Sequence, residues 1–211
     1  MTPSAATAPI KGAISLILAS QSPRRHDLLR NAGWSFACIP SDAEEWEAVD
    51  ADPTSIVRHN ASVKAAAIAR FHPHCLVIGA DTIVALDKRV FHKPADLNEA
   101  RSFLRILSGR THVVHTGVAL VGPRGRADHV FVETTAVTFR PLTEEAISEY
   151  LDLVHTLDKA GAYGAQEHGE RIIAQYDGLF SNVMGLPIER LDPILRERLQ
   201  TEPKGECGQR D

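Results

Sequence analysis

A long apolar segment that contains a single carboxylate is the feature that most constrains the fold of this chain. The segment LVIGADTIVAL, residues 76–86, is apolar almost throughout, and Asp81 lies in its middle. Such a run is typical of a strand that is buried on both faces of a sheet. An ionised carboxylate there costs several kcal/mol unless a cation or hydrogen-bond donors meet it. Asp81 is therefore a candidate metal ligand or general base. The alternative is a carboxylate that only caps a neighbouring element.

The rest of the sequence alternates between predicted helices and predicted strands. Apolar patterns predict further strands at residues 14–19, 111–121, 129–140 and near 171–175. Start and stop signals predict helices at residues 23–32, 53–71, 97–108, 144–154 and 187–199, the first three with Ser22, Asp52 and Asp96 as N-caps. The apolar face of the third helix is expected to consist of Leu97, Ala100, Leu104 and Leu107. This alternation, with one hairpin-like pair around a turn at residues 122–125, indicates an α/β class with a mixed sheet.

Composition and charge narrow the class of protein. Of the 211 residues, 44% are hydrophobic, which suits a domain with a buried core. The net charge of -4 argues against broad binding of duplex DNA and favours a small-molecule pocket in which positive charge is local. No apolar run approaches the ~18 residues of a membrane helix, and the first residues do not resemble a secretory signal.

The ends of the chain and the cysteines complete the expected organisation. We expect one domain over residues 14–200 and mobile tails at residues 1–13 and 201–211. Cys38, Cys75 and Cys207 match neither a zinc-site spacing nor a disulfide framework. This pattern favours a reducing compartment, and we therefore expect a cytoplasmic protein.

The turn SQSPRR, which follows the first predicted strand, is a candidate phosphate site. The N-terminus of a helix presents free N–H groups and a partial positive charge, so acidic residues are usual there. This helix instead begins with Arg24 and Arg25, and Ser20 and Ser22 add hydroxyl groups. Two guanidinium groups at this position make sense if a phosphate docks against them. The alternative is two solvated arginines.

Further charged residues are scattered along the chain. Glu44 and Glu45 could supply a second metal ligand, and the lysines Lys64, Lys93 and Lys159 lie at separate positions. Each of these residues taken alone is typical of a solvated surface. Only a fold that gathers them would create a polyphosphate site.

Several segments together resemble one family. ASQSPRRHDLL, VIGADTIV, HKPADLNEA, LSGRTHVVHTGVAL, LDKAGAYGAQ and SNVMGLP are similar, in this order, to motifs of the Maf family of nucleotide pyrophosphatases. The resemblance covers about residues 14–200. It implies an elongated, two-lobed α/β fold with a central cleft, similar to inosine-triphosphate pyrophosphatases and usually dimeric. Two small departures are Ala165 and the pair Phe91-His92, which precedes Lys93.

The resemblance also implies an activity and a set of site residues. The family hydrolyses nucleoside triphosphates to the monophosphate and pyrophosphate with Mg²⁺ or another divalent cation such as Mn²⁺ or Co²⁺. Asp81 matches its proposed proton acceptor. The positions that match its triphosphate cleft are Ser20, Arg24, Arg25, Glu45, Lys64 and Lys93, and Lys159 is a further candidate substrate ligand.

Substrate choice follows from finer details of the resemblance. Arg25, Thr82 and Gln166 match positions that select pyrimidines in the branch that acts on dTTP and UTP. We hypothesise that Asp81 and Glu45 hold the metal ion while Asp81 deprotonates or orients the attacking water. Two alternatives remain at this stage. One is hydrolysis of 7-methyl-GTP or another modified nucleotide, and the other is a non-catalytic, nucleotide-binding regulator of cell division.

Overall fold

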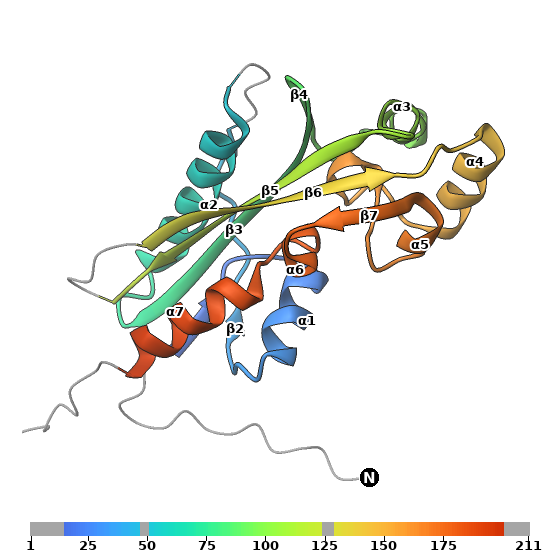
Figure 1. Cartoon of the computed structure of the whole chain (residues 1–211). Helices are drawn as coiled ribbons and strands as arrows, with labels where there is room; N and C mark the ends of the chain where they lie inside the picture. The colour runs from blue at the N-terminus through green and yellow to red at the C-terminus, as the bar shows by residue number, and fades with distance from the viewer. Residues whose placement is uncertain (1–14, 47–50, 124–128, 201–211) are drawn as a thin grey trace, which may run out of the picture.

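The computed structural model describes residues 15–46, 51–123 and 129–200 (Figure 1). Seven strands form one sheet: β1 (Ser15–Leu18), β2 (Ala37–Cys38), β3 (Cys75–Leu86), β4 (Arg89–Phe91), β5 (Thr111–Val121), β6 (His129–Phe139) and β7 (Ile173–Asp177). The helices are α1 (Pro23–Asn31), α2 (Pro53–Ala69), α3 (Leu97–Leu107), α4 (Glu144–Leu153), η1 (Ala160–Ala162), α5 (Gly169–Ile172), α6 (Phe180–Val183) and α7 (Ile188–Gln200). None of the helices within these residues is both long and apolar enough to cross a membrane.

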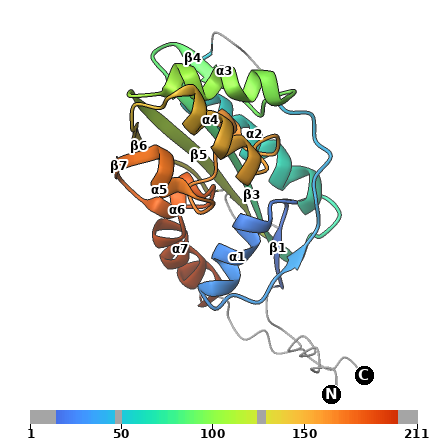
Figure 2. The ribbon, with the colours of Figure 1, turned by 90° about the vertical axis from the view of Figure 1, so that its right-hand side faces the viewer.

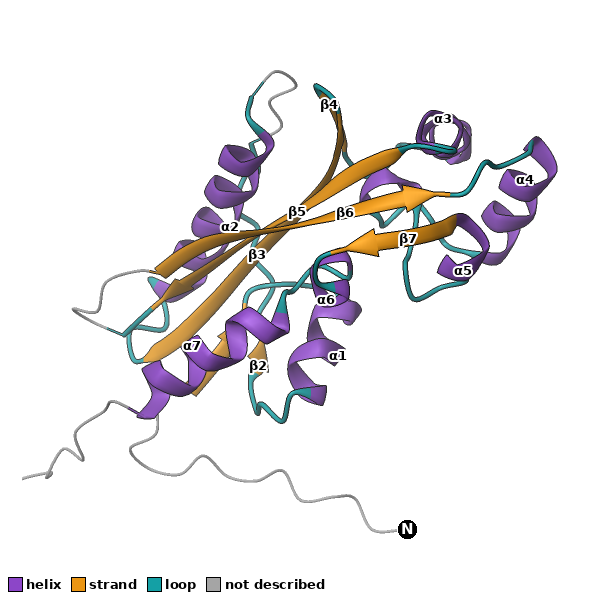
Figure 3. Ribbon diagram, viewed as in Figure 1, coloured by secondary structure: helices purple, strands orange, loops and turns teal. Residues whose placement is uncertain are grey.

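The sheet is mixed, as the sequence predicts (Figure 3). The strand order is β2-β1-β3-β5-β6-β7, and β4 pairs with β3 beside this path. The β1 strand runs parallel to β2 and β3. In the order β3-β5-β6-β7, each strand pairs antiparallel with the next. The α/β class with a mixed sheet is thereby confirmed.

Two apolar cores lie at opposite ends of the same face of β3. Leu76, Ile78 and Ala80 pack into one core with residues of α1 and α7. Val84 and Leu86 pack into the other core with residues of α3 and α4. Figure 2 shows α3 and α4 at one end of the molecule and α1 and α7 at the other. The molecule therefore has the two lobes that were predicted, and β3 runs through both.

The helix α2 covers the opposite face of the sheet at very short range. A Cβ atom added to Gly79 would lie 2.2 Å from the carbonyl oxygen of Ala61, and one added to Gly117 would lie 2.2 Å from that of Val57. Only glycine leaves room for a helix backbone at this distance. Gly79 and Gly117 are thus the contact points on which α2 rests.

The middle of β3 has one open edge. On the edge opposite to β5, Cys75–Ile78 pairs with β1 and Val84–Leu86 pairs with β4. Within the residues that the structure describes, no strand pairs with residues 79–83 on that edge. Side chains of this stretch can therefore reach the space between β1 and β4 from either face of the strand.

Most predicted elements are confirmed, with differences at their ends. The strand predicted near residues 171–175 is wrong at its start, because Gly169–Ile172 forms the short helix α5 before β7 begins. Leu97 is 55% exposed rather than part of the apolar face, because the buried residues of α3 begin at Ala100. The expected tails, Cys207 and residues 124–125 of the predicted turn lie outside the described residues.

The contact at Gly79 predicts a loss of stability in the variant Gly79→Ala. The new methyl group would push α2 away from the sheet, at a cost of about 3 kcal/mol in the free energy of unfolding. Gly33→Ala is the matched control, since nothing lies within 4 Å of its added Cβ and only the φ of +87° opposes the change. The free energy of unfolding of that control should fall by about 1 kcal/mol. Equal losses in urea unfolding of the two variants would contradict the contact role of Gly79.

A second stability prediction concerns His112 on β5. This residue is 1% exposed, and its Nε2 atom lies 2.8 Å from the hydroxyl oxygen of Tyr163. Burial lowers the pKa of His112 from 6.5 to about 4. As the pH falls below 6.5, His112 is therefore protonated in the unfolded chain before it is protonated in the folded protein. The free energy of unfolding should fall by about 3 kcal/mol from this group by pH ~4. His112→Gln should lose less stability than wild type between pH ~7 and ~4.5 in urea unfolding. Parallel losses in the two proteins would exclude His112 as the cause.

Candidate functional site

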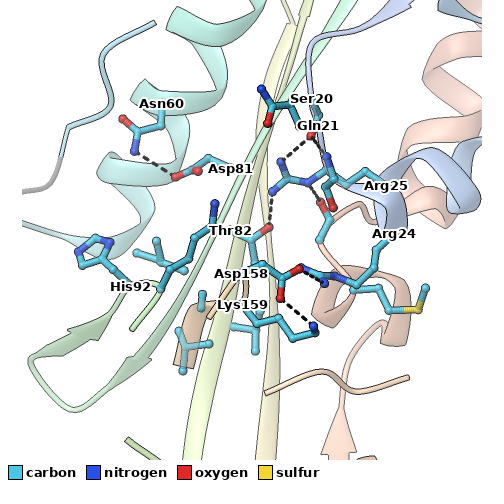
Figure 4. A pocket seen from close by; sticks show the side chains of 18 of the residues that line it. Ser20, Gln21, Arg24, Arg25, Asn60, Asp81, Thr82, His92, Asp158 and Lys159 are labelled. Carbon is cyan, nitrogen blue, oxygen red and sulfur yellow. Dashed lines mark hydrogen bonds and ion pairs between the residues drawn. The ribbon is translucent and has the colours of Figure 1, made fainter. Parts of the chain in front are cut away.

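A cleft of about 580 Å³ lies between the two cores, beside the open edge of β3. Nine residues predicted to form the site line it: Ser20, Arg24, Arg25, Glu45, Lys64, Asp81, Thr82, Lys93 and Lys159. The structure thus brings together segments that are far apart in the sequence (Figure 4). Gln166 differs, because its side chain is exposed and its neighbour Ala165 lines the cleft in its place.

Asp81 is a buried carboxylate with two partners on α2. It is 7% exposed, and its Oδ1 accepts a hydrogen bond from Lys64 Nζ at 2.8 Å. Its Oδ2 accepts one from Asn60 Nδ2 at 3.1 Å. Burial alone would raise the pKa of Asp81, but Lys64, Arg25 and Asn60 together hold that pKa below its ordinary value. Asp81 is therefore ionised at neutral pH, and α2 supplies the compensation that its burial requires.

The carboxylate of Glu45 converges on the same ammonium group as Asp81. Lys64 Nζ lies 3.0 Å from Glu45 Oε1 and 2.8 Å from Asp81 Oδ1. No group of three or more His, Cys, Asp or Glu side chains suited to a metal ion occurs in the described part of the chain. Mg²⁺ is commonly bound by only one or two carboxylates, together with substrate phosphates and water. The paired oxygens of Asp81 and Glu45 fit that kind of site.

Arg25 ties three segments together on the other face of β3. Its Nε donates to the Gly185 carbonyl at 2.7 Å, Nη1 to the Ala80 carbonyl at 2.8 Å, and Nη2 to Thr82 Oγ1 at 2.9 Å. Burial lowers the pKa of Arg25, although the charge of Asp81 raises it. The Ala80 carbonyl belongs to the open edge of β3, so the guanidinium takes the place of a missing strand there. Thr82 is held in turn by a 3.0 Å hydrogen bond to Thr116 Oγ1.

The turn between β1 and α1 differs in detail from the expected phosphate loop. Ser22 occupies the N-cap position, but its side chain makes no capping hydrogen bond. Ser20 Oγ accepts from the Ser22 N–H at 3.2 Å and from Arg25 Nη1 at 3.3 Å. Its hydroxyl proton remains available as a donor toward the cleft that Ser20 lines.

Arg24 and Lys159 meet at a carboxylate that the sequence did not single out. Arg24 Nη1 lies 3.2 Å from Asp158 Oδ2, and Lys159 Nζ lies 2.8 Å from Asp158 Oδ1 (Figure 4). Burial would raise the pKa of Asp158, but Lys159 and then Arg24 lower it overall. Lys93 also lines the cleft, and it is exposed there.

Sequence reasoning missed Asn60 and Asp158. Asn60 could have been found, because it precedes Lys64 by one helical turn and therefore shares its face of α2. Asp158 carries no such signal, since its contact with Arg24 joins residues that are 134 positions apart. His92 and Trp46 also line the cleft, and the sequence analysis had noted His92 only as a departure from the family pattern.

The chain is similar to several known proteins. The chain is 50% identical over 173 residues to a dTTP/UTP pyrophosphatase of Akkermansia muciniphila, a match that covers 82% of this chain and 90% of the relative. It is 45% identical over 181 residues to the dTTP/UTP pyrophosphatase of Bacillus cytotoxicus, with 86% and 94% covered. Among solved structures, the Ham1 protein of Staphylococcus aureus aligns with a TM-score of 0.47 and 15% identity, over 90% of this chain and 100% of that one. The model of the family described as Maf-like protein matches residues 15–198, and the chain therefore belongs to the Maf family.

Proposed function

We propose that this protein hydrolyses nucleoside triphosphates, dTTP and UTP among them, at the bond between the α and β phosphates. The products are the nucleoside monophosphate and pyrophosphate. The observation that carries the proposal is the ionised, buried Asp81 in a cleft that also presents Arg24, Lys64 and Lys93. The names of the relatives, which are 50% and 45% identical over most of their length, support the same reaction.

In the proposed mechanism, the cations of the cleft bind the phosphates and Asp81 acts on the water. Arg24 and Lys93 neutralise charge on the β and γ phosphates, which leave as pyrophosphate. Asp81 accepts a hydrogen bond from the attacking water and orients it for in-line attack on the α phosphorus. Because the pKa of Asp81 is lowered, orientation is its main contribution and full removal of a proton is secondary.

A divalent cation, Mg²⁺ or a similar ion such as Mn²⁺ or Co²⁺, completes this proposal. Asp81 and Glu45 are the residues that would hold it, since their oxygens already converge on one positive charge. When bound, such an ion neutralises phosphate charge and polarises the phosphoryl group.

The proposed preference for pyrimidine nucleotides rests on the unit formed by Arg25 and Thr82. Their 2.9 Å hydrogen bond fixes a polar surface on the cleft side of β3. A fixed polar surface discriminates between bases, because a wrong base leaves its donors or acceptors unpaired. Gln166 would contribute only if the loop that contains it turned toward the cleft, since its side chain is exposed.

The proposal includes a cytoplasmic location and a homodimer. The homodimer follows from the resemblance described above, and the location is supported by the thiols of Cys38 and Cys75, which are free. No contact with nucleic acid is proposed.

The central test is the release of pyrophosphate from a panel of nucleoside triphosphates with Mg²⁺. Wild type should act on dTTP and UTP, and Asp81→Asn should reduce kcat by about a hundredfold to ten-thousandfold, because it removes the group that orients the water. Asp87→Asn is the matched control, since Asp87 lies in the turn after β3 and pairs with Arg110 outside the cleft. That control should retain full activity.

Other outcomes of the panel would favour the alternatives. Release confined to 7-methyl-GTP or another modified nucleotide would keep the reaction and overturn the substrate preference. Tight nucleotide binding with no release from any member of the panel would support a non-catalytic regulator. Equal activity of wild type and Asp81→Asn would remove Asp81 from the mechanism.

The ion pair between Lys64 and Asp81 predicts a shift in the pH dependence. Lys64 is the main group that lowers the pKa of Asp81 against the effect of burial. In Lys64→Met that pKa should rise, so the acid limb of kcat/KM should move to higher pH by about one unit or more. Lys88→Met, a change in the exposed turn after β3, is the control and should leave the limb in place. If the acid limb of kcat/KM stays at the same pH in Lys64→Met, ionisation of Asp81 does not determine the position of that limb.

A further inference from the structure

One ion pair connects the two lobes across the cleft. Arg24 lies on α1, whose Leu28 and Leu29 pack into the core beside the N-terminal half of β3. Asp158 lies between Val154 and Ala162, which pack into the core at the other end of β3. The 3.2 Å contact between Arg24 Nη1 and Asp158 Oδ2 therefore joins elements of the two cores.

Lys159 fixes the position of Asp158. The side chain of Lys159 is 4% exposed, and its ammonium group contacts Asp158 Oδ1 at 2.8 Å, Glu167 Oε1 at 3.2 Å and the His155 carbonyl. These three acceptors match the three N–H donors of a lysine. Binding a phosphate through Lys159 would therefore require breaking one of these three contacts. Lys159 is better placed to hold a carboxylate than to bind a substrate.

Asp158 leaves most of the Arg24 guanidinium available. Within the described residues, the hydrogen bonds of Arg24 involve only Nη1, and its side chain is 23% exposed. The group can therefore keep Asp158 on one edge and present its remaining donors to the cleft that it lines. A guanidinium binds phosphate best when two donors face the oxygens together.

We propose that Asp158 and Lys159 are positioning residues that orient Arg24 for the phosphates of the substrate. Lys159 holds Asp158, and Asp158 holds one edge of Arg24, so the remaining donors face the cleft before substrate arrives. This assignment rests on the proposed function, because it requires a polyphosphate in the cleft. It also changes the role of Lys159 from a substrate ligand to a residue that acts through its neighbour.

The test is a double-mutant cycle of Asp158→Asn and Arg24→Ala, with kcat and KM measured by release of pyrophosphate from dTTP. Asp158→Asn should raise KM about fivefold and leave kcat within about twofold, as expected for a partly exposed ion pair that supports binding. In the Arg24→Ala background, Asp158→Asn should leave KM unchanged, because the residue through which it acts is gone. Thermal unfolding of each variant separates this effect from a loss of stability.

Three results would overturn the proposal. An equal rise in KM in both backgrounds would show that Asp158 acts independently of Arg24. A lower KM in Asp158→Asn would make Asp158 a competitor of the phosphates rather than a support. An unchanged KM would give it no role. Asp152→Asn, which alters an exposed carboxylate of α4 outside the cleft, is the matched control and should change neither constant.

Additional measurements keep the test decisive. Asp158→Glu retains the charge but moves it, so it should raise KM less than Asp158→Asn and also have no effect in the Arg24→Ala background. It replaces Asp158→Asn in the cycle if that variant does not fold. If wild type releases no pyrophosphate, the proposed function fails by itself, and the same cycle is then measured on the Kd of dTTP by calorimetry. If the effects of the two mutations on Kd depend on each other, the proposed orientation of Arg24 by Asp158 is still supported. If the effects are independent, the proposal is rejected.

Discussion

The buried ion pair between Asp81 and Lys64 is the interaction on which the fold and the site both depend. A carboxylate in the middle of β3 would cost several kcal/mol if it were left unpaired. Its compensation comes from Asn60 and Lys64, which reach it only because α2 rests directly on the sheet at Gly79 and Gly117. The glycines are therefore as much a part of the site as the charged groups. A fold that separated α2 from β3 would be unstable and inactive for the same reason.

Alternation along β3 gives the site two supports of different kinds. Asp81 points toward α2, and its neighbour Thr82 points toward the opposite face, where Arg25 and Thr116 hold it. Both side chains line the cleft because the strand has an open edge at this point. The face of β3 that carries Thr82 has an apolar core at each end. Within the described part of β3, Thr82 therefore lies in the gap between the two cores. The position of the cleft follows from this interruption of apolar packing.

The sequence predicted most helices and strands and nine of the residues that line the cleft. It predicted few of the side-chain contacts between residues that are far apart in the chain. The long apolar run around Asp81 identified β3 and its carboxylate, because both the length of the run and the cost of the charge are local properties. The caps Asp52 and Asp96 were likewise confirmed by hydrogen bonds within their own helices. Asp158 was missed because its role depends on a residue that only the tertiary fold brings near. The acceptors that Arg25 and Lys159 contact were also not predicted, since a sequence shows a cation but not the groups with which it pairs.

The balance of charge in the cleft explains how an acidic chain can bind a polyanion. The cleft is lined by five cationic side chains and three carboxylates, whereas the whole chain has a net charge of -4. The charged side chains of the cleft are thus positive in sum, although those of the whole chain are negative in sum. Each carboxylate also has a cation as a partner, so Arg24, Lys64 and Lys159 are held in position before a ligand arrives. Groups fixed in this way lose little conformational entropy on binding, and their charge is available when pyrophosphate begins to leave.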